Sequence, residues 1–151
     1  MLRKPWIAVV SAAAVAAFVV SPALADQIFH TTHASLHAVA GAPLQSGFVT
    51  DIHTNGNVNA AHEEYQLNGA QPSTTYQVQL VIYASQGCLG TPFLTIPTVT
   101  LTTNGTGNGN AKFVFPAGPP NNPPLEVGIV WQFLSNGVTV YATDCVPVAI
   151  D

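Results

Sequence analysis

Apolar and polar side chains alternate along several stretches of this chain, and this alternation restricts the fold more than any other feature. Between Thr75 and Tyr83 an aromatic or aliphatic residue stands at every second position, with glutamines between them. Successive side chains of a β-strand point to opposite faces, so this pattern predicts a half-buried antiparallel strand. The stretch from Val127 to Leu134 alternates in the same way and predicts a second such strand.

Turn signals divide the chain into about eight short strands. The expected strands are 33–41, 46–53, 58–67, 75–83, 98–103, 111–115, 127–134 and 138 to about 148. The pair Asn136-Gly137 predicts a two-residue hairpin, because both central residues of a type I′ turn need a positive φ. Many short strands at this spacing indicate an all-β sandwich or barrel.

Two connections between these strands can be predicted further. The strand at 98–103 should place Val99 and Leu101 inward and Thr98 outward, with the other threonines. The glycine-rich segment 104–110 then predicts a hairpin with the strand at 111–115. Proline lacks a backbone donor and cannot lie inside a sheet, so we expect the proline-rich segment 116–124 to be an extended surface loop.

The amino-terminal segment has the pattern of a secretory signal. A basic start precedes an apolar run from Trp6 to Val20, and Ala23-Leu24-Ala25 follows it. This order predicts cleavage after the last of these alanines. An uncleaved membrane anchor is the alternative, but the run is shorter than the roughly 20 residues that a spanning helix needs. We therefore expect a signal at 1–25 and a single exported domain at 26–151 that does not insert into a membrane.

Charge is scarce outside that signal, and it is negative. Charged residues make up 7% of the chain, whereas an average domain has about 25%. Two of the three basic residues, Arg3 and Lys4, lie in the signal, which leaves Lys112 with seven carboxylates. Nucleic acids and anionic lipids are bound through clustered lysines and arginines, so neither is an expected partner.

Both cysteines, Cys88 and Cys145, follow the signal. Exported proteins with two cysteines usually pair them, so we predict a disulfide. It would close a loop of about 58 residues and stabilise the fold by roughly 4 kcal/mol. A redox or metal-binding thiol pair is the alternative, but the Cys-x-x-Cys spacing that would favour it does not occur.

The histidines all lie between residues 30 and 62 and could bind a metal. His30, His33 and His37 have the spacing of one helical face, whereas on a strand only the last two would share a face. His62 and Glu64 would share a face of another strand. Histidine is the commonest metal ligand, so these side chains are candidates for a zinc or copper site. The alternative is that they are ordinary polar surface residues, since no His-Glu-x-x-His motif or zinc-finger spacing occurs.

One pair of residues has the spacing of a catalytic dyad. Asp51 and His53 could align a carboxylate and an imidazole on one strand face, as the orienting group and the base of a nucleophilic site. No Gly-x-Ser-x-Gly motif supplies the nucleophile. An exposed strand end is the alternative interpretation.

Two pairs of carboxylates could serve glycoside hydrolysis, which needs two acids flanking the sugar. Glu63 and Glu64 are adjacent and would point to opposite faces of a strand. Glu126 and Asp144 lie on the two arms of the last predicted hairpin and could be close together. Acidic residues of an exported domain also serve solubility, which is the simpler interpretation.

Aromatic residues and the proline-rich loop supply material for a binding surface. Tyr65, Tyr83, Trp131 and Tyr141, with the many Asn and Gln side chains, are typical of carbohydrate or protein recognition. Core packing is the alternative, and it is favoured for Trp131. The loop at 116–124 is a recognition element or, more simply, a linker.

The segment Ala70-Gln-Pro72-Ser-Thr74-Thr-Tyr76-Gln-Val78 resembles the Leu-x-Pro-x-Thr-x-Tyr-x-Val signature of fibronectin type III domains. The resemblance implies an immunoglobulin-like β-sandwich in which Tyr76 forms a tyrosine corner, its hydroxyl bonding back to nearby backbone. Ala70 stands where the family usually has leucine, and about four strands follow the motif instead of one. Only the fold and the corner are therefore carried over.

These patterns together predict an antiparallel immunoglobulin-like β-sandwich with one disulfide. Its expected function is non-catalytic and needs no cofactor: binding of an extracellular protein or glycan, adhesion, or a structural role at the cell exterior. A histidine-based zinc- or copper-binding protein is the first alternative, and a small secreted hydrolase is the second.

Overall fold

The chain folds into antiparallel β-strands. The computed structural model describes residues 29–39, 41–54, 60–119 and 125–150, so the predicted signal at 1–25 lies outside the described residues. The strands are β1 (Phe29–Ala38), β2 (Ser46–Thr54), β3 (Ala61–Asn68), β4 (Thr75–Tyr83), β5 (Leu94–Thr102), β6 (Gly109–Val114), β7 (Leu125–Ser135), β8 (Val138–Thr143) and β9 (Val146–Ile150). The predicted all-β, antiparallel fold is confirmed, with nine strands in place of about eight. Within these residues, no helix has the length and apolar character needed to cross a membrane.

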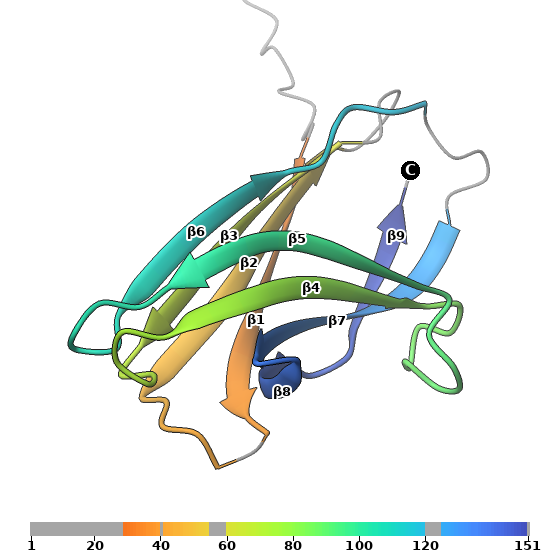
Figure 1. The fold of residues 1–151 in the computed structure, drawn as a ribbon. Helices are drawn as coiled ribbons and strands as arrows, with labels where there is room; N and C mark the ends of the chain where they lie inside the picture. Colours follow the sequence, from red (N-terminus) through yellow and green to blue (C-terminus); the bar gives the residue numbers. More distant parts are fainter. Residues whose placement is uncertain (1–28, 40, 55–59, 120–124, 151) are drawn as a thin grey trace, which may run out of the picture.

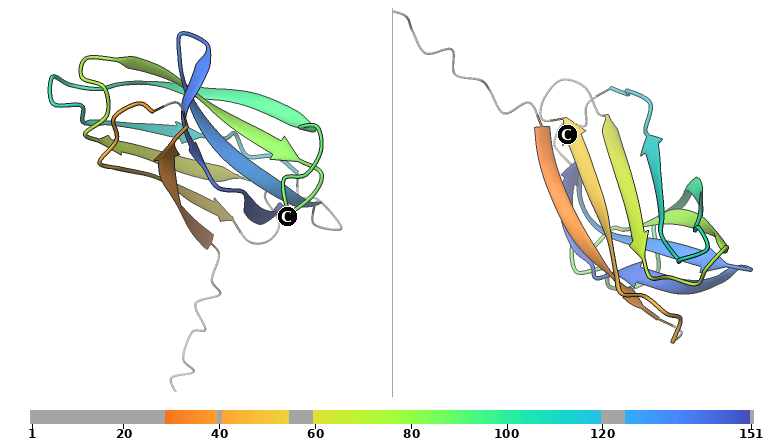
Figure 2. Two further views of the ribbon diagram at one scale, coloured as in Figure 1. Left: turned by 90° about the horizontal axis from the view of Figure 1, so that it is seen from below. Right: turned by 90° about the vertical axis from the view of Figure 1, so that its left-hand side faces the viewer.

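The strands form one strongly curved sheet in the order β5-β4-β7-β8-β1-β2-β3-β6, and β9 pairs with β7. Figures 1 and 2 show the β1-β2-β3-β6 half lying across the half that contains β4, β5 and β7, with the apolar core between them. The two end strands, β5 and β6, contact each other but share no ladder in the part of the chain that is described. The sheet is therefore nearly closed, like a barrel.

The predicted alternation is confirmed in β4 and β7. The inward side chains are buried in both: Tyr76, Val78, Leu80 and Ile82 in β4, and Val127, Ile129, Trp131 and Phe133 in β7. The hairpin at Asn136-Gly137 is confirmed as well, since these residues have φ values of 51° and 78° and Ser135 pairs with Val138. Local sequence signals are sufficient to define these elements.

The hairpin predicted between 98–103 and 111–115 is wrong. β5 pairs with β4 and β6 pairs with β3, so the segment between them crosses from one end of the sheet to the other. The crossing is held locally, because the Asn104 backbone N–H donates to the Asn108 carbonyl at 2.8 Å. A glycine-rich segment after a strand indicates that the chain turns, but it does not determine which strand comes alongside.

The side chain of Thr98 points inward, against the prediction. The register of β5 shifts opposite Gln77 and Gln79, and such a bulge moves the two-residue period by one position. The Thr98 hydroxyl accepts a hydrogen bond from the Tyr65 hydroxyl at 3.0 Å and donates to the Val78 carbonyl at 3.3 Å. Beyond the bulge the predicted alternation returns, since Leu101 is buried.

The last predicted strand, 138 to about 148, is two strands. β8 pairs with β1 and with the second half of β7, whereas β9 pairs with the first half of β7. At the break between them the Thr143 hydroxyl accepts the Trp131 backbone N–H at 3.1 Å. The Thr143 hydroxyl therefore replaces a backbone carbonyl as the acceptor for Trp131. The chain can then turn away from β7 after β8 and pair with β7 again as β9.

The predicted disulfide is present: Cys145, in this break, is bonded to Cys88 in the loop after β4. That loop packs closely on β7 at Gly128. A Cβ atom at Gly128 would lie 2.4 Å from the Ser85 carbonyl oxygen and 2.8 Å from the Cys88 sulfur. Glycine is therefore required where the disulfide loop meets the sheet.

Tyr76 is buried, and its hydroxyl lies 3.4 Å from the hydroxyl of Tyr141. Tyr141 in turn donates to the Pro43 carbonyl at 2.7 Å. The Gln71 backbone N–H donates to the Tyr141 hydroxyl at 3.4 Å. Burial raises the pKa of Tyr76 and the Tyr141 hydroxyl raises it further, whereas Thr74 and the Gln71 backbone act in the opposite direction. The phenol is therefore neutral and fixed in the core.

Candidate functional site

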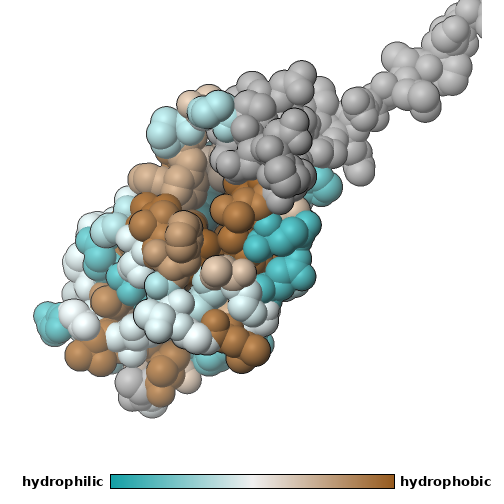
Figure 3. Space-filling view, turned by 90° about the vertical axis from the view of Figure 1, so that its right-hand side faces the viewer, coloured by the Kyte–Doolittle hydropathy of each residue, from teal (hydrophilic) through white to brown (hydrophobic). Residues whose placement is uncertain are grey.

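An apolar cavity of about 300 Å³ opens at the end of the curved sheet where β2 ends and β3 begins. Most of its wall is aliphatic or aromatic, from four strands and the segment after β6: Leu80, Ile82, Ile96, Phe115, Ile129, Val148 and Ile150. On the face shown in Figure 3, apolar residues gather around a hollow. A concave, mostly apolar surface of this kind is the usual form of a small-molecule site.

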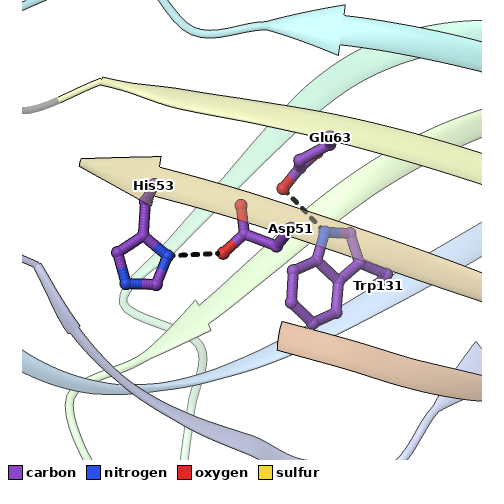
Figure 4. A network of polar contacts seen from close by, with 4 residues as sticks. All are labelled: Asp51, His53, Glu63 and Trp131. Carbon is purple, nitrogen blue, oxygen red and sulfur yellow. Dashed lines mark hydrogen bonds and ion pairs between the residues drawn. The ribbon is translucent and has the colours of Figure 1, made fainter. Parts of the chain in front are cut away.

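Three ionisable side chains line the same cavity: Asp51, His53 and Glu63. Asp51 and His53 are two positions apart on β2, so the pleat turns both to the inner face. Glu63 stands directly opposite Asp51 on β3. Figure 4 shows Asp51 between His53 and Glu63, with the Trp131 indole beside Glu63.

Asp51 and His53 form a hydrogen-bonded pair, with 3.1 Å between Asp51 Oδ2 and His53 Nδ1. The prediction that they share a strand face is confirmed, and the alternative of an exposed strand end is wrong, because Asp51 is 5% exposed. His30 of β1 pairs with His53 in the ladder, and their rings stack with centroids 5.2 Å apart. The hydrolase hypothesis also needs a nucleophile, but none of the described residues that line the cavity is a serine or a cysteine.

Glu63 is 1% exposed and receives hydrogen bonds from two other buried side chains. The Trp131 indole N–H donates to Oε1 at 2.7 Å, and the Tyr65 hydroxyl donates to Oε2. Burial raises the pKa of Glu63 to about 7 and the Asp51 carboxylate adds to the rise, although both hydrogen bonds act in the opposite direction. Burial also raises the pKa of Tyr65, so that phenol remains a donor. Glu63 therefore changes its protonation state near neutral pH.

The predicted metal ligands of β1 do not lie together. His33 and His37 lie on the outer face, where His33 packs against Phe48 and His37 Nδ1 lies 3.8 Å from Asp144 Oδ1. His30 lies on the inner face, as the period of a strand requires. In the described ranges of the chain, no group of three His, Cys, Asp or Glu side chains could hold a metal ion.

The remaining predicted ligands, His62 and Glu64, share the outer face of β3, as predicted. His62 Nε2 lies 3.5 Å from Glu64 Oε1, and the Lys112 ammonium lies 2.5 Å from the same oxygen. The hydrogen bond and the charge of Lys112 lower the pKa of Glu64. The carboxylate therefore already has a cationic partner, and a zinc or copper site stays a prediction.

The carboxylate pairs suggested by the sequence are not the pair that the fold forms. Glu63 and Glu64 point to opposite faces, as predicted. Glu126 and Asp144 each have a different partner: the first accepts a hydrogen bond from Gln86, and the second lies near His37.

The pair that does form, Asp51 and Glu63, depends on the register between β2 and β3, which the sequence does not reveal. One usable signal exists, because Glu63 occupies an inward position of the alternation that continues through Tyr65 and Leu67. An acid at an inward position among apolar residues is the mark of a functional or buried polar group.

The aromatic residues expected at a binding surface are mostly in the core. Tyr65, Trp131 and Tyr141 are buried, and Tyr83 is half-buried, so core packing is confirmed for Trp131. Part of the proline-rich segment, 120–124, lies outside the described residues. Its first residue, Pro116, lines the apolar cavity.

The cavity combines two kinds of hydrogen-bonding group with apolar walls. The Asp51 carboxylate accepts hydrogen bonds, whereas Glu63 accepts when ionised and donates when protonated. Low polarity around them strengthens each bond, so the site can hold an apolar molecule by a polar head or exchange a proton with it.

No protein-family model, curated protein or solved structure matches this chain. The function is therefore inferred from the cavity itself.

Proposed function

We propose that the mature chain is an exported, non-catalytic binding protein whose ligand is a small apolar molecule with one polar head. The observation that carries this proposal is the apolar cavity of about 300 Å³ with Asp51, His53 and Glu63 in its wall. Small-molecule pockets combine mostly apolar walls with a few placed polar groups, and their volumes are roughly 300–1,000 Å³. A volume near the lower end of that range favours a compact ligand.

The polar head that suits this site is a hydroxyl or an amine N–H. Either group can donate to the Asp51 carboxylate, and Glu63 can accept or donate beside it. An anionic head would be repelled by Asp51 and, above neutral pH, by Glu63 as well. A ligand without a donor would gain no hydrogen bond to the Asp51 carboxylate and would therefore bind more weakly.

Export is supported by the signal pattern at 1–25 and by the disulfide between Cys88 and Cys145, which is typical of oxidising compartments. An immunoglobulin-like sandwich is part of the same proposal. It is supported by the two halves of the sheet that lie across each other and by the buried Tyr76, whose hydroxyl is linked through Tyr141 to the Gln71 backbone.

The proposal is tested with two probes of nearly the same shape. N-phenyl-1-naphthylamine has an apolar body and one N–H donor, whereas 1-benzylnaphthalene has a methylene group in place of the N–H and no donor. We expect the amine to bind with increased fluorescence, and the hydrocarbon to bind roughly tenfold more weakly because it lacks the hydrogen bond to the carboxyl groups. Equal affinities would contradict the role of Asp51 and Glu63, and no binding of either probe would overturn the proposal.

Replacing one of two alanines with phenylalanine locates the bound probe. Ala61 lines the cavity, and Ala61→Phe should lower the affinity for the amine by roughly tenfold or more, because the ring occupies the ligand's space. Ala149 is exposed on β9, and Ala149→Phe is the matched control, expected to leave the affinity unchanged. Unchanged binding in both variants would place the probe outside the cavity.

The non-catalytic part needs a test of its own, because Asp51 and His53 are hydrogen-bonded as in a catalytic dyad. The ester 1-naphthyl acetate has an apolar body that suits the cavity, and its hydrolysis releases fluorescent 1-naphthol. We expect the protein and its Asp51→Asn variant to release naphthol at the same background rate. Faster release by the unsubstituted protein alone would favour the hydrolase alternative.

A further inference from the structure

A second hollow, of about 450 Å³, lies at the opposite end of β2 and β3 from the apolar cavity. Its wall is rich in carboxamide side chains, and we call it the amide groove. Its principal residues are Phe48, Gln66, Asn68, Asn104, Asn108 and Asn110. Among the described residues that line it, none carries a charge.

One wall of the amide groove is a row of side chains on the outer face of the sheet. Phe48 pairs with Gln66 in the β2–β3 ladder, and Gln66 pairs with Asn110 in the β3–β6 ladder. Three neighbouring strands therefore present an aromatic ring and two amides side by side. His33 packs against Phe48 with ring centroids 4.5 Å apart, which holds the ring in place.

The other wall is the turn that crosses from β5 to β6, and hydrogen bonds fix its shape. The Asn104 side-chain oxygen accepts from the backbone N–H groups of Thr106 and Asn108, both at 2.9 Å. The Asn108 side-chain oxygen accepts from the Gly69 backbone N–H at 3.1 Å. Because these bonds use the oxygens, the amide nitrogens keep their two donors each for a ligand.

Close packing also holds the turn against the body of the protein. Gly107 has a φ of +81°, and a Cβ atom there would lie 2.1 Å from the Ala70 carbonyl oxygen. The Ala70 backbone N–H donates to the Gly107 carbonyl at 3.0 Å. The groove is thus formed before any ligand arrives, which lowers the entropic cost of binding.

We propose that the amide groove binds a neutral oligosaccharide. Amides can donate to and accept from hydroxyl groups, and an aromatic ring can stack on the apolar face of a sugar. The wall has no charged side chain to pair with an ionic ligand. The site is separate from the apolar cavity, so this proposal does not depend on the function proposed above.

The test is titration of the ¹⁵N-labelled protein with cellohexaose, laminarihexaose or chitohexaose, followed by two-dimensional NMR. We expect at least one of these neutral sugars to shift the backbone amide signals of 46–48, 66–68 and 104–110. The double variant Gln66→Ala/Asn110→Ala should weaken binding by roughly tenfold, since each amide contributes hydrogen bonds. Both side chains are exposed, so the variant should fold normally.

The matched control is Gln71→Ala, which removes an exposed carboxamide outside the groove and should leave the affinity unchanged. The proposal is overturned if none of the three sugars shifts the groove signals at millimolar concentration. It is also overturned if the double variant binds as tightly as the unsubstituted protein. Shifts confined to residues of the apolar cavity would contradict it as well.

Discussion

Asp51 and Glu63 are direct cross-strand partners on β2 and β3, and both carboxyl groups are buried. Two acids in such positions cannot both be ionised without cost, because each charge is removed from water and repels the other. Hydrogen bonds offset part of this cost: His53 bonds to Asp51, and Trp131 and Tyr65 donate to Glu63. Buried acids at the wall of an apolar cavity indicate function rather than stability.

The stability of the protein should fall as the pH rises through the interval from 4.5 to about 7. The pKa of Glu63 is raised from 4.5 to about 7 in the folded protein, so the native state binds more protons than the unfolded state in this interval. Above it, the ionised Glu63 costs about 3 kcal/mol of unfolding free energy. We expect Glu63→Gln to remove this fall and to be the more stable protein at about pH 8, as measured by urea unfolding.

The matched control for that experiment is Glu64→Gln, on the outer face of the same strand. Lys112 lowers the pKa of Glu64, so this carboxyl group affects stability only below pH 4.5. The control should therefore keep the decline in stability above pH 4.5. A Glu63→Gln variant whose stability declines like that of the unsubstituted protein would contradict the role of Glu63.

Replacing Asp51 with asparagine should lower the pKa of Glu63. Burial remains the main reason for the raised value, so the pKa should stay above 4.5 but lie below about 7. Carbon-13 NMR titration of the Glu63 carboxyl group measures this directly. Asp144→Asn serves as the control, because Asp144 is exposed and far from β3 in the strand order. An identical Glu63 titration in all three proteins would show that the two buried acids are not coupled.

Removal of the disulfide should destabilise the protein strongly. Cys88 and Cys145 are 57 residues apart in sequence, and opening a loop of this length releases roughly 4 kcal/mol of chain entropy in the unfolded state. The double variant Cys88→Ser/Cys145→Ser should unfold at a correspondingly lower urea concentration. Equal midpoints for the oxidised protein and the variant would refute the stabilising role.

Gly128→Ala should destabilise the protein by about 1–3 kcal/mol, because the new methyl group would overlap the Ser85 carbonyl oxygen and the disulfide sulfur. Gly105→Ala is the control, since nothing lies within 4 Å of a Cβ atom there. Thermal unfolding compares the two. A destabilisation of the same size in both variants would point to the backbone rather than to this contact.

The sequence predicts those parts of the fold that depend on neighbours in the chain. The strand at 75–83 coincides with β4, and the Asn136-Gly137 turn lies where it is expected, because alternation and turn chemistry are local properties. The disulfide could be predicted because only two cysteines are present. The shared face of Asp51 and His53 likewise follows from the period of a single strand.

Features that depend on distant segments could not be predicted. The glycine-rich turn suggests a hairpin, yet β5 pairs with β4, the strand before it, and β6 pairs with the still earlier strand β3. The contact between Trp131 and Glu63 joins strands that are not adjacent in the sheet, so it arises only when the two halves close on each other. A single bulge is enough to turn Thr98 inward, and no residue type in β4 or β5 indicates where the bulge occurs.

The pairing of β1 with β8 also bears on when this protein folds. Leu36 in β1, the first described strand, pairs with Thr143 in β8, so β1 has only its partner β2 until β8 has been synthesised. Contacts between such distant segments form slowly, since a long loop must close first. The export proposed above requires the chain to remain unfolded while it crosses a membrane. The strand order suits this requirement, because the sheet cannot be completed before β8 is available to pair with β1.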